Sequence, residues 1–168
     1  MTAIPNRYHL CTLWRTPSPL ERVWPLILHS ENWPRWWRGV EQARTVRANE
    51  GDDGVGSIVH YVWRSTLGYR LRFDVEATQV VPHVLLEGAA RGDVRGIGRW
   101  RFRRVADATE IHHAWDVEVE RPGLRLIAPV ARPLFEWNHR RLMRLGARGL
   151  ARELGQPVAC EHERSALT

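Results

Sequence analysis

Residues 69–76 read Tyr-Arg-Leu-Arg-Phe-Asp-Val-Glu, so that apolar and charged side chains alternate without interruption. Successive side chains of a β-strand point to opposite faces, and this period of two therefore predicts a strand with one apolar and one charged face. Residues 57–64, 99–103 and 110–119 show the same alternation. Because the turns in this region are short, we expect an antiparallel meander that contacts water on one side only.

Helical segments are predicted on both sides of the meander. Before it, residues 18–21 (Ser-Pro-Leu-Glu) combine an N-cap serine, a first-turn proline and an acidic residue, and a second short helical piece follows. After it, residues 124–154 form a long helical run that Pro129 is expected to interrupt. A sheet with one dry face must cover that face, and only the long helix is long enough. The sequence thus predicts an α+β domain over residues 1–155, with residues 156–168 as a loose tail.

Composition narrows the class of protein. The 168 residues, with 43% hydrophobic content, suit a single globular domain, and no run of apolar residues is long enough to cross a membrane. Residues 1–7 lack the apolar core of a signal peptide, so we expect a cytoplasmic protein. The formal charge of +6 comes with 25 arginines and no lysine. Since these arginines are scattered along the chain, we do not expect a nucleic-acid partner.

The apolar face of the predicted sheet is unevenly filled. Two neighbouring strands place small residues on it, namely Gly88, Ala90, Gly92, Gly96 and Gly98. Glycines can bend a sheet through bulges, but small residues opposite a helix can also leave space. We favour a cavity rimmed by aromatic side chains, the usual form of a small-molecule site. Its predicted walls are Tyr61, Trp63, Tyr69, Phe73, Trp100 and Trp115 of the sheet, with Phe135 and Leu142 of the helix.

Four segments together resemble the START-like (SRPBCC) superfamily. Residues 18–24 (Ser-Pro-x-Glu-x-Val-Trp) and 33–37 (Trp-Pro-x-Trp-Trp) carry the resemblance near the N-terminus. Residues 92–100 (Gly-Asp-x-x-Gly-x-Gly-x-Trp) and 132–139 (Arg-Pro-Leu-Phe-x-Trp-Asn-His) are similar to its bacterial polyketide cyclase/dehydrase-like branch. The resemblance implies a helix-grip fold over the chain to about Gly155. In that fold a curved seven-stranded antiparallel sheet grips a long C-terminal helix, with two short N-terminal helices and a deep cavity between.

Two polar residues are candidates for catalysis inside the expected cavity. His113 lies on the apolar phase of its strand, where an imidazole can act as acid or base or simply donate a core hydrogen bond. Asn138 lies on the helix face that meets the sheet. Its amide would either hold a ligand carbonyl or tie down the helix where Pro133 lacks an N–H. No spacing typical of a metal site or a nucleotide-binding loop occurs, so we expect no metal and no other cofactor.

The expected function is the binding of a hydrophobic or aromatic small molecule in the cavity, as in a polyketide cyclase-like protein. One alternative is a true aromatase/cyclase or dehydratase, in which His113 and Asn138 would move protons among enols and carbonyls. Another is a non-catalytic lipid carrier or sensor, which would dock on membranes through a stripe at Arg140, Arg144, Arg148 and Arg152. A membrane is a less favoured partner than a small molecule. The same stripe also fits a solvated helix face. If the mouth of the cavity lies near Asp93, the neighbouring Arg91 and Arg95 would meet an anionic ligand.

Overall fold

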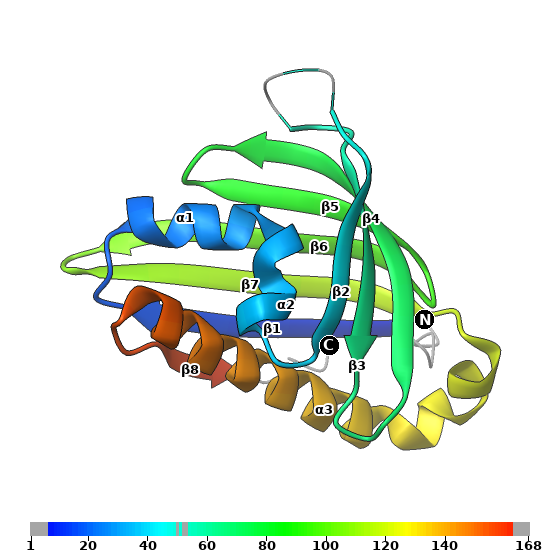
Figure 1. Cartoon of the computed structure of the whole chain (residues 1–168). Coiled ribbons are helices and arrows are strands. Elements are labelled where there is room, and N and C mark those ends of the chain that lie inside the picture. The colour runs from blue at the N-terminus through cyan, green and yellow to red at the C-terminus, as the bar shows by residue number, and fades with distance from the viewer. Residues whose placement is uncertain (1–6, 50, 52–53, 163–168) are drawn as a thin grey trace, which may run out of the picture.

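A curved antiparallel sheet is the largest element of the molecule (Figure 1). The structure, a computed structural model, describes residues 7–49, 51 and 54–162, and only the backbone of residues 125–130. Within these residues eight strands pair in the order β2-β3-β4-β5-β6-β7-β1-β8. They are β1 (Arg7–Thr16), β2 (Val40–Arg47), β3 (Ile58–Arg64), β4 (Arg70–Val81), β5 (Leu85–Gly92), β6 (Val94–Val105), β7 (Ala108–Val119) and β8 (Ala159–His162).

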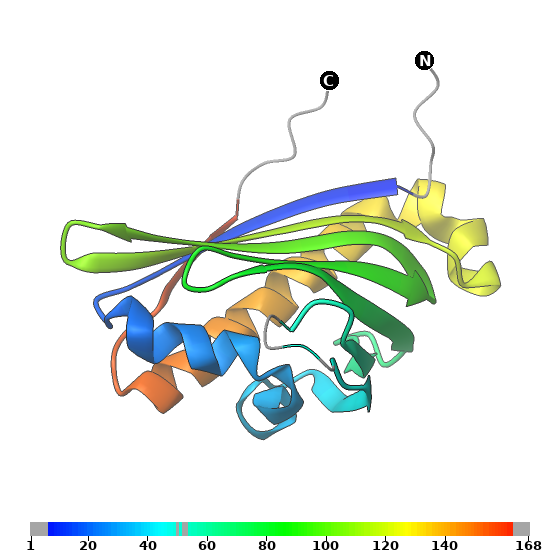
Figure 2. The same cartoon turned by 90° about the horizontal axis from the view of Figure 1, so that it is seen from above.

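Helices cover the apolar face of the sheet, as the alternation predicts. They are α1 (Leu20–Leu28), the short 3-10 helix η1 (Ser30–Asn32), α2 (Trp33–Trp36) and the long α3 (Pro122–Leu154). Figure 2 shows α1, α2 and most of α3 on the same side of the sheet. The predicted meander runs from β2 to β7, and β1 joins it beside β7. The α+β arrangement with a long C-terminal helix is therefore confirmed.

The sheet has one strand more than the seven that the family resemblance implies. Residues 159–162, expected within a loose tail, form β8 and pair with residues 12–15 of β1. A four-residue strand is too short to show an alternating pattern of its own. Its pairing depends on the free edge of β1, which only the folded sheet provides. That the ligand-binding domain ends at residue 155 stays a prediction.

Two details of the helices differ from the sequence prediction. The N-cap of α1 is Pro19, not Ser18, and the carbonyl of Ser18 accepts a hydrogen bond from Thr109 Oγ1 at 2.7 Å instead. Ser18 is thus held by β7 rather than by its own helix. Pro129 does not divide α3, which is continuous from Pro122 to Leu154. Figure 1 shows the first turns of α3, in yellow, set at an angle to the rest, which is how helices accommodate proline.

The second half of α3 packs tightly against the core. Gly146 and Gly149 face α2, and a Cβ on either would overlap the ring of Trp37 or the carbonyl of Trp36. The close approach lets Trp37 Nε1 donate to the carbonyl of Leu142 at 2.9 Å. The buried α3 residues beyond this point are Met143, Ala147, Leu150 and Leu154. This end of the sheet–helix space is therefore tightly packed.

Candidate functional site: an aromatic cavity

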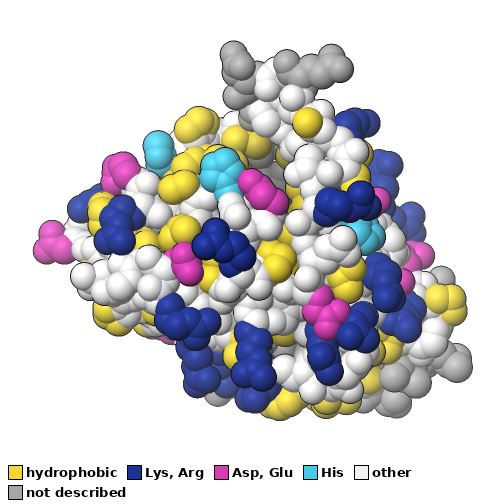
Figure 3. Space-filling model, viewed as in Figure 1, with side chains coloured by type: hydrophobic (Ala, Val, Ile, Leu, Met, Phe, Trp, Pro, Cys, Tyr) yellow, Lys and Arg dark blue, Asp and Glu magenta, His cyan; other side chains and the backbone are white. Residues whose placement is uncertain are grey.

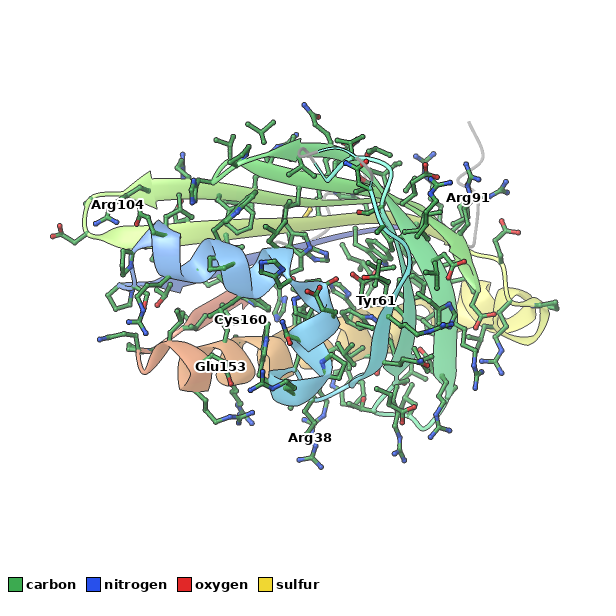
Figure 4. The ribbon with its side chains drawn as sticks, turned by 45° about the horizontal axis from the view of Figure 1, so that its top comes forward. Arg38, Tyr61, Arg91, Arg104, Glu153 and Cys160 are labelled. Atoms are coloured by element: carbon green, nitrogen blue, oxygen red, sulfur yellow. The ribbon has the colours of Figure 1, made fainter. Side chains whose placement is uncertain are left out.

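An internal cavity of about 290 Å³ lies between the sheet and the first half of α3. All ten residues predicted for the site line its wall: Tyr61, Trp63, Tyr69, Phe73, Trp100, His113, Trp115, Phe135, Asn138 and Leu142. Figure 4 shows Tyr61 among the side chains that lie between the sheet and the helices. The structure thus brings the predicted set together around one space. Their roles in binding and catalysis stay predictions.

The glycines of β5 and β6 have two different roles. Gly88 and Gly98 pair across the two strands and line the cavity. A Cβ on Gly88 would overlap Val75, and one on Gly98 would overlap the ring of Trp115. These glycines therefore let larger neighbours lie flat on the sheet.

Gly92 and Gly96 do not line the cavity, so the expectation that the small residues leave space for it is wrong at these two positions. Both have positive φ values, +134° and +154°, in the region that L side chains avoid. At each of the two glycines the backbone of a neighbouring strand, β4 for Gly92 and β7 for Gly96, comes so close that a Cβ would overlap it. Gly92 and Gly96 therefore bend the sheet, which is the role that the alternative interpretation of the glycines gave them. Ala90 is buried and also lies outside the cavity wall.

Trp33 is a central ring of the wall and was not among the predicted residues. Its ring centroid lies 5.8 Å from that of Tyr61, 6.4 Å from Trp63 and 5.9 Å from Trp100. Trp33 Nε1 donates to the carbonyl of Leu26 at 3.1 Å, which fixes the plane of the indole. The motif at residues 33–37 was the signal that could have identified Trp33 as a wall residue. The contacts of this motif with the sheet, however, arise only after folding.

His113 and His139 form a pair of buried imidazoles at the wall. Their rings are nearly parallel, with centroids 6.0 Å apart, and His113 packs against Trp100 at 4.1 Å. His113 Nδ1 and His139 Nε2 have no hydrogen-bond partner among the residues that the structure describes. Burial lowers the pKa of His113 well below its usual value, with a smaller contribution from His139. Burial likewise lowers the pKa of His139 to about 3, so both rings are neutral at pH 7.

Asn138 connects α3 to the turn between β3 and β4. Its Oδ1 accepts hydrogen bonds from Ser65 Oγ at 2.9 Å, from the backbone N–H of Thr66 at 3.0 Å and from Thr66 Oγ1 at 2.9 Å. Because a backbone N–H can only donate, the acceptor must be the amide oxygen. The carbonyl is therefore occupied by the turn, which neither predicted role included. Its Nδ2 makes no hydrogen bond to any described residue and is the part available to a ligand.

The expected anionic subsite at Arg91 and Arg95 does not form. Neither residue lines the cavity, and Figure 4 shows Arg91 at the periphery of the molecule, pointing outward. Arg95 pairs with Glu120 at 3.0 Å on the surface. Asp93 accepts a hydrogen bond from the backbone N–H of Arg72 at 2.8 Å, so its carboxylate joins the turn between β5 and β6 to β4.

A family model described as polyketide cyclase / dehydrase and lipid transport matches residues 16–144. The chain belongs to this family. The match to the polyketide cyclase/dehydrase and lipid transport family runs from the end of β1 into the middle of α3, and so includes most of the cavity wall. No curated protein matches the chain.

Solved structures share the helix-grip fold of this family member. A protein of Thermus thermophilus is 23% identical, with a TM-score of 0.68 over 86% of this chain and 99% of that one. The Zhui aromatase/cyclase of Streptomyces sp. R1128 is 16% identical, with a TM-score of 0.70 over 89% and 94%. A START superfamily protein of Mycobacterium smegmatis is 16% identical, with a TM-score of 0.69 over 88% and 98%. At these identities the likeness establishes the fold alone.

In residues 7–49, 51 and 54–162, no three His, Cys, Asp or Glu side chains gather closely enough to hold a metal ion. None of the helices in this part of the chain combines the length and apolar character needed to span a bilayer.

Proposed function

We propose that this chain binds a hydrophobic or aromatic small molecule in the cavity, as a polyketide cyclase-like member of its family. The observation that carries the proposal is a space of about 290 Å³ whose apolar wall includes many aromatic rings. Protein interiors contain few voids larger than a water molecule, and pockets for small molecules are concave and mostly apolar. The family membership supports the same function.

The polar groups of the wall support binding more than catalysis. A general acid or base works best when its pKa lies near the working pH. Burial moves the pKa values of His113 and His139 far below 7, so neither ring exchanges protons readily at neutral pH. Asn138 has no titratable group and its oxygen is occupied by Ser65 and Thr66. An aromatase/cyclase or dehydratase activity remains the alternative, and it predicts that His113→Ala abolishes turnover while leaving ligand binding.

Filling the cavity tests the binding proposal. Val59 lines it from β3, whereas Val46 on the neighbouring β2 is 46% exposed and lies outside it. We expect the wild type and Val46→Trp to bind the apolar dye N-phenyl-1-naphthylamine alike, and Val59→Trp to bind it at least about tenfold more weakly. Equal binding by all three proteins, or by none, would contradict the proposal. Native mass spectrometry of protein purified from its own host should also show a retained apolar ligand.

A lipid carrier is the second candidate, and one surface of α3 favours it. Leu134 and Trp137 lie one helical turn apart and are 45% and 44% exposed. Leu67, 42% exposed, is close to them because the neighbouring Thr66 bonds to Asn138. Tryptophan and leucine beside arginine are typical of surfaces that rest on anionic membranes. Among the arginines of this helix whose side chains the structure describes, those without an ion pair to a described residue are Arg140, Arg141, Arg144, Arg148 and Arg152. Arg152 instead donates to the backbone carbonyl of Trp36.

Vesicle binding distinguishes this candidate. Figure 3 shows dark-blue side chains along the lower edge of the molecule, where α3 lies in Figure 1. A carrier should bind vesicles that contain phosphatidylserine, less at high salt, and the change of Arg140, Arg144 and Arg148 to glutamine should remove the binding. The same changes should leave dye binding in the cavity intact. Absence of vesicle binding by the wild type would leave only the soluble ligand-binding role.

A further inference from the structure

The wall of the cavity is free of arginine, although the chain has 25 arginines. This holds for every arginine whose side chain the structure describes. The alternation of the strands explains it, because arginines of β4 and β6 such as Arg72 and Arg101 lie on the charged phase and are exposed on the outer face. Among the side chains that the structure describes, a buried anion would therefore find no cationic group inside the cavity.

Glu87 is the one carboxylate among the described wall residues, and its charge is already compensated. Its two oxygens accept hydrogen bonds from Arg99 Nε at 2.6 Å and from Thr78 Oγ1 at 2.9 Å. Thr78 lies on β4 and Arg99 on β6, and neither side chain lines the cavity. The Thr78 hydrogen bond and the Arg99 guanidinium hold the pKa of Glu87 below its usual value, so it stays ionised. An anionic ligand would therefore gain no partner at Glu87, and a cationic ligand would compete with Arg99.

The remaining titratable side chains of the described wall are neutral at pH 7. Burial raises the pKa values of Tyr8, Tyr61 and Tyr69, so these phenols keep their protons. Burial lowers those of His113 and His139, so these imidazoles do not take one up. No group at the wall can therefore change its charge to match an ionic ligand near neutral pH.

We propose that the ligand of this cavity is electrically neutral, and that the cavity discriminates against carboxylates and ammonium ions of the same shape. The proposal rests on the proposed binding function and narrows it to a charge class. An ion that leaves water needs a partner charge or several hydrogen bonds. The described wall supplies no cationic side chain, and its one carboxylate, Glu87, is already paired with Arg99. The donors at the wall, such as Asn138 Nδ2, suit the oxygen of a neutral carbonyl or hydroxyl.

A pair of matched probes tests this discrimination. At neutral pH 2-naphthamide is neutral and 2-naphthoate is an anion of nearly the same shape. Displacement of N-phenyl-1-naphthylamine from the wild type should give a dissociation constant at least about tenfold larger for the carboxylate at pH 7. Between pH 7 and pH 5 the apparent affinity for 2-naphthoate should rise by about tenfold per pH unit, because only its protonated form binds. The affinity for 2-naphthamide should not change.

The outcomes separate this inference from the binding function itself. If 2-naphthoate binds as tightly as 2-naphthamide at pH 7, and Val59→Trp weakens both, the binding function stands and the neutral-ligand inference is wrong. If 2-naphthylmethylammonium binds as tightly as the amide, the inference is wrong for cations. If no probe binds, or Val59→Trp changes nothing, the proposed function fails and the inference fails with it.

Discussion

The side-chain oxygen of Asn138 accepts hydrogen bonds from Ser65 and Thr66, and so a single amide holds the turn after β3 against α3. Asn138 is 5% exposed, which keeps water from replacing these bonds. Its most important contribution is therefore to the shape of the cavity. Asn138, whose position suggests a ligand contact, thus also fixes the turn after β3 that borders the cavity wall.

Asn138→Ala should lower the free energy of unfolding by about 2 kcal/mol, since buried donors at Ser65 and Thr66 lose their acceptor. Urea denaturation monitored by circular dichroism measures the change. Asn138→Asp is the matched control, because its carboxylate keeps an acceptor oxygen and should recover most of the loss. An alanine variant as stable as the wild type would show that the turn does not depend on this amide.

The buried histidines predict a dependence of stability on pH. His139 has a pKa of about 3 in the folded protein, below its ordinary value, and the pKa of His113 is lowered in the same sense. Between the folded and unfolded values the unfolded chain binds more protons, so the free energy of unfolding falls as pH decreases from about 6.5. At pH 5 each histidine should cost on the order of 2 kcal/mol relative to pH 8.

His113→Phe keeps a ring against Trp100 and removes one titrating group. Its stability should therefore decrease less than that of the wild type between pH 8 and pH 5, as measured by chemical denaturation at each pH. This interval lies above the range in which Glu110, with a pKa of about 2 set by Arg103 and Arg15, takes up protons. An identical pH profile for the variant would show that His113 does not titrate on unfolding.

At the scale of elements, the contact between α2 and α3 depends on glycine. Alanine is normally favoured over glycine inside a helix by about 1 kcal/mol. Gly149→Ala should reverse this sign and destabilise the protein by about 1–3 kcal/mol, because its Cβ would overlap the carbonyl of Trp36. Gly123 lies in the same helix with nothing within 4 Å of its Cβ position, so Gly123→Ala should be neutral or stabilising. Thermal unfolding compares the two, and equal effects would exclude the overlap as the cause.

The last strand protects an edge. β8 pairs with residues 12–15 of β1, which would otherwise present unpaired backbone groups. Deletion of residues 156–168 should lower the melting temperature and increase concentration-dependent self-association, as measured by calorimetry and light scattering. A truncated chain that stays monomeric and equally stable would mean that β8 contributes little to protecting the sheet.

At the scale of the whole molecule, the sequence predicted the fold because burial imposes a period on each strand. The alternation at residues 69–76 separates inward from outward side chains, and the same parity placed His113 and Trp115 on the wall. The long C-terminal helix and the short turns between strands then allow only a few ways of packing the helices on the sheet. The short β8 was not predicted, because its four residues acquire a partner only in the folded sheet.

Parts of the site could not be predicted, because they depend on contacts between elements. Trp33 reaches the wall from α2 and His139 from α3, and the orientation of each helix is set by its packing against the other and against the rest of the fold. Gly96 looked like free space in the sequence, whereas its positive φ and the close backbone of β7 show a bend. A one-dimensional pattern gives the direction of a side chain, but it gives neither the partner nor the volume around it.

The two halves of α3 have a consequence for divergence within the family. Residues from Met143 onward hold the helix on the core, while the wall residues before this point, such as Phe135 and Leu142, border the cavity. Substitutions of these wall residues change the shape of the cavity directly, whereas the contacts from Met143 onward stay in place. A lineage of such proteins can therefore acquire new ligands by changes in one half of a helix while the other half preserves the fold.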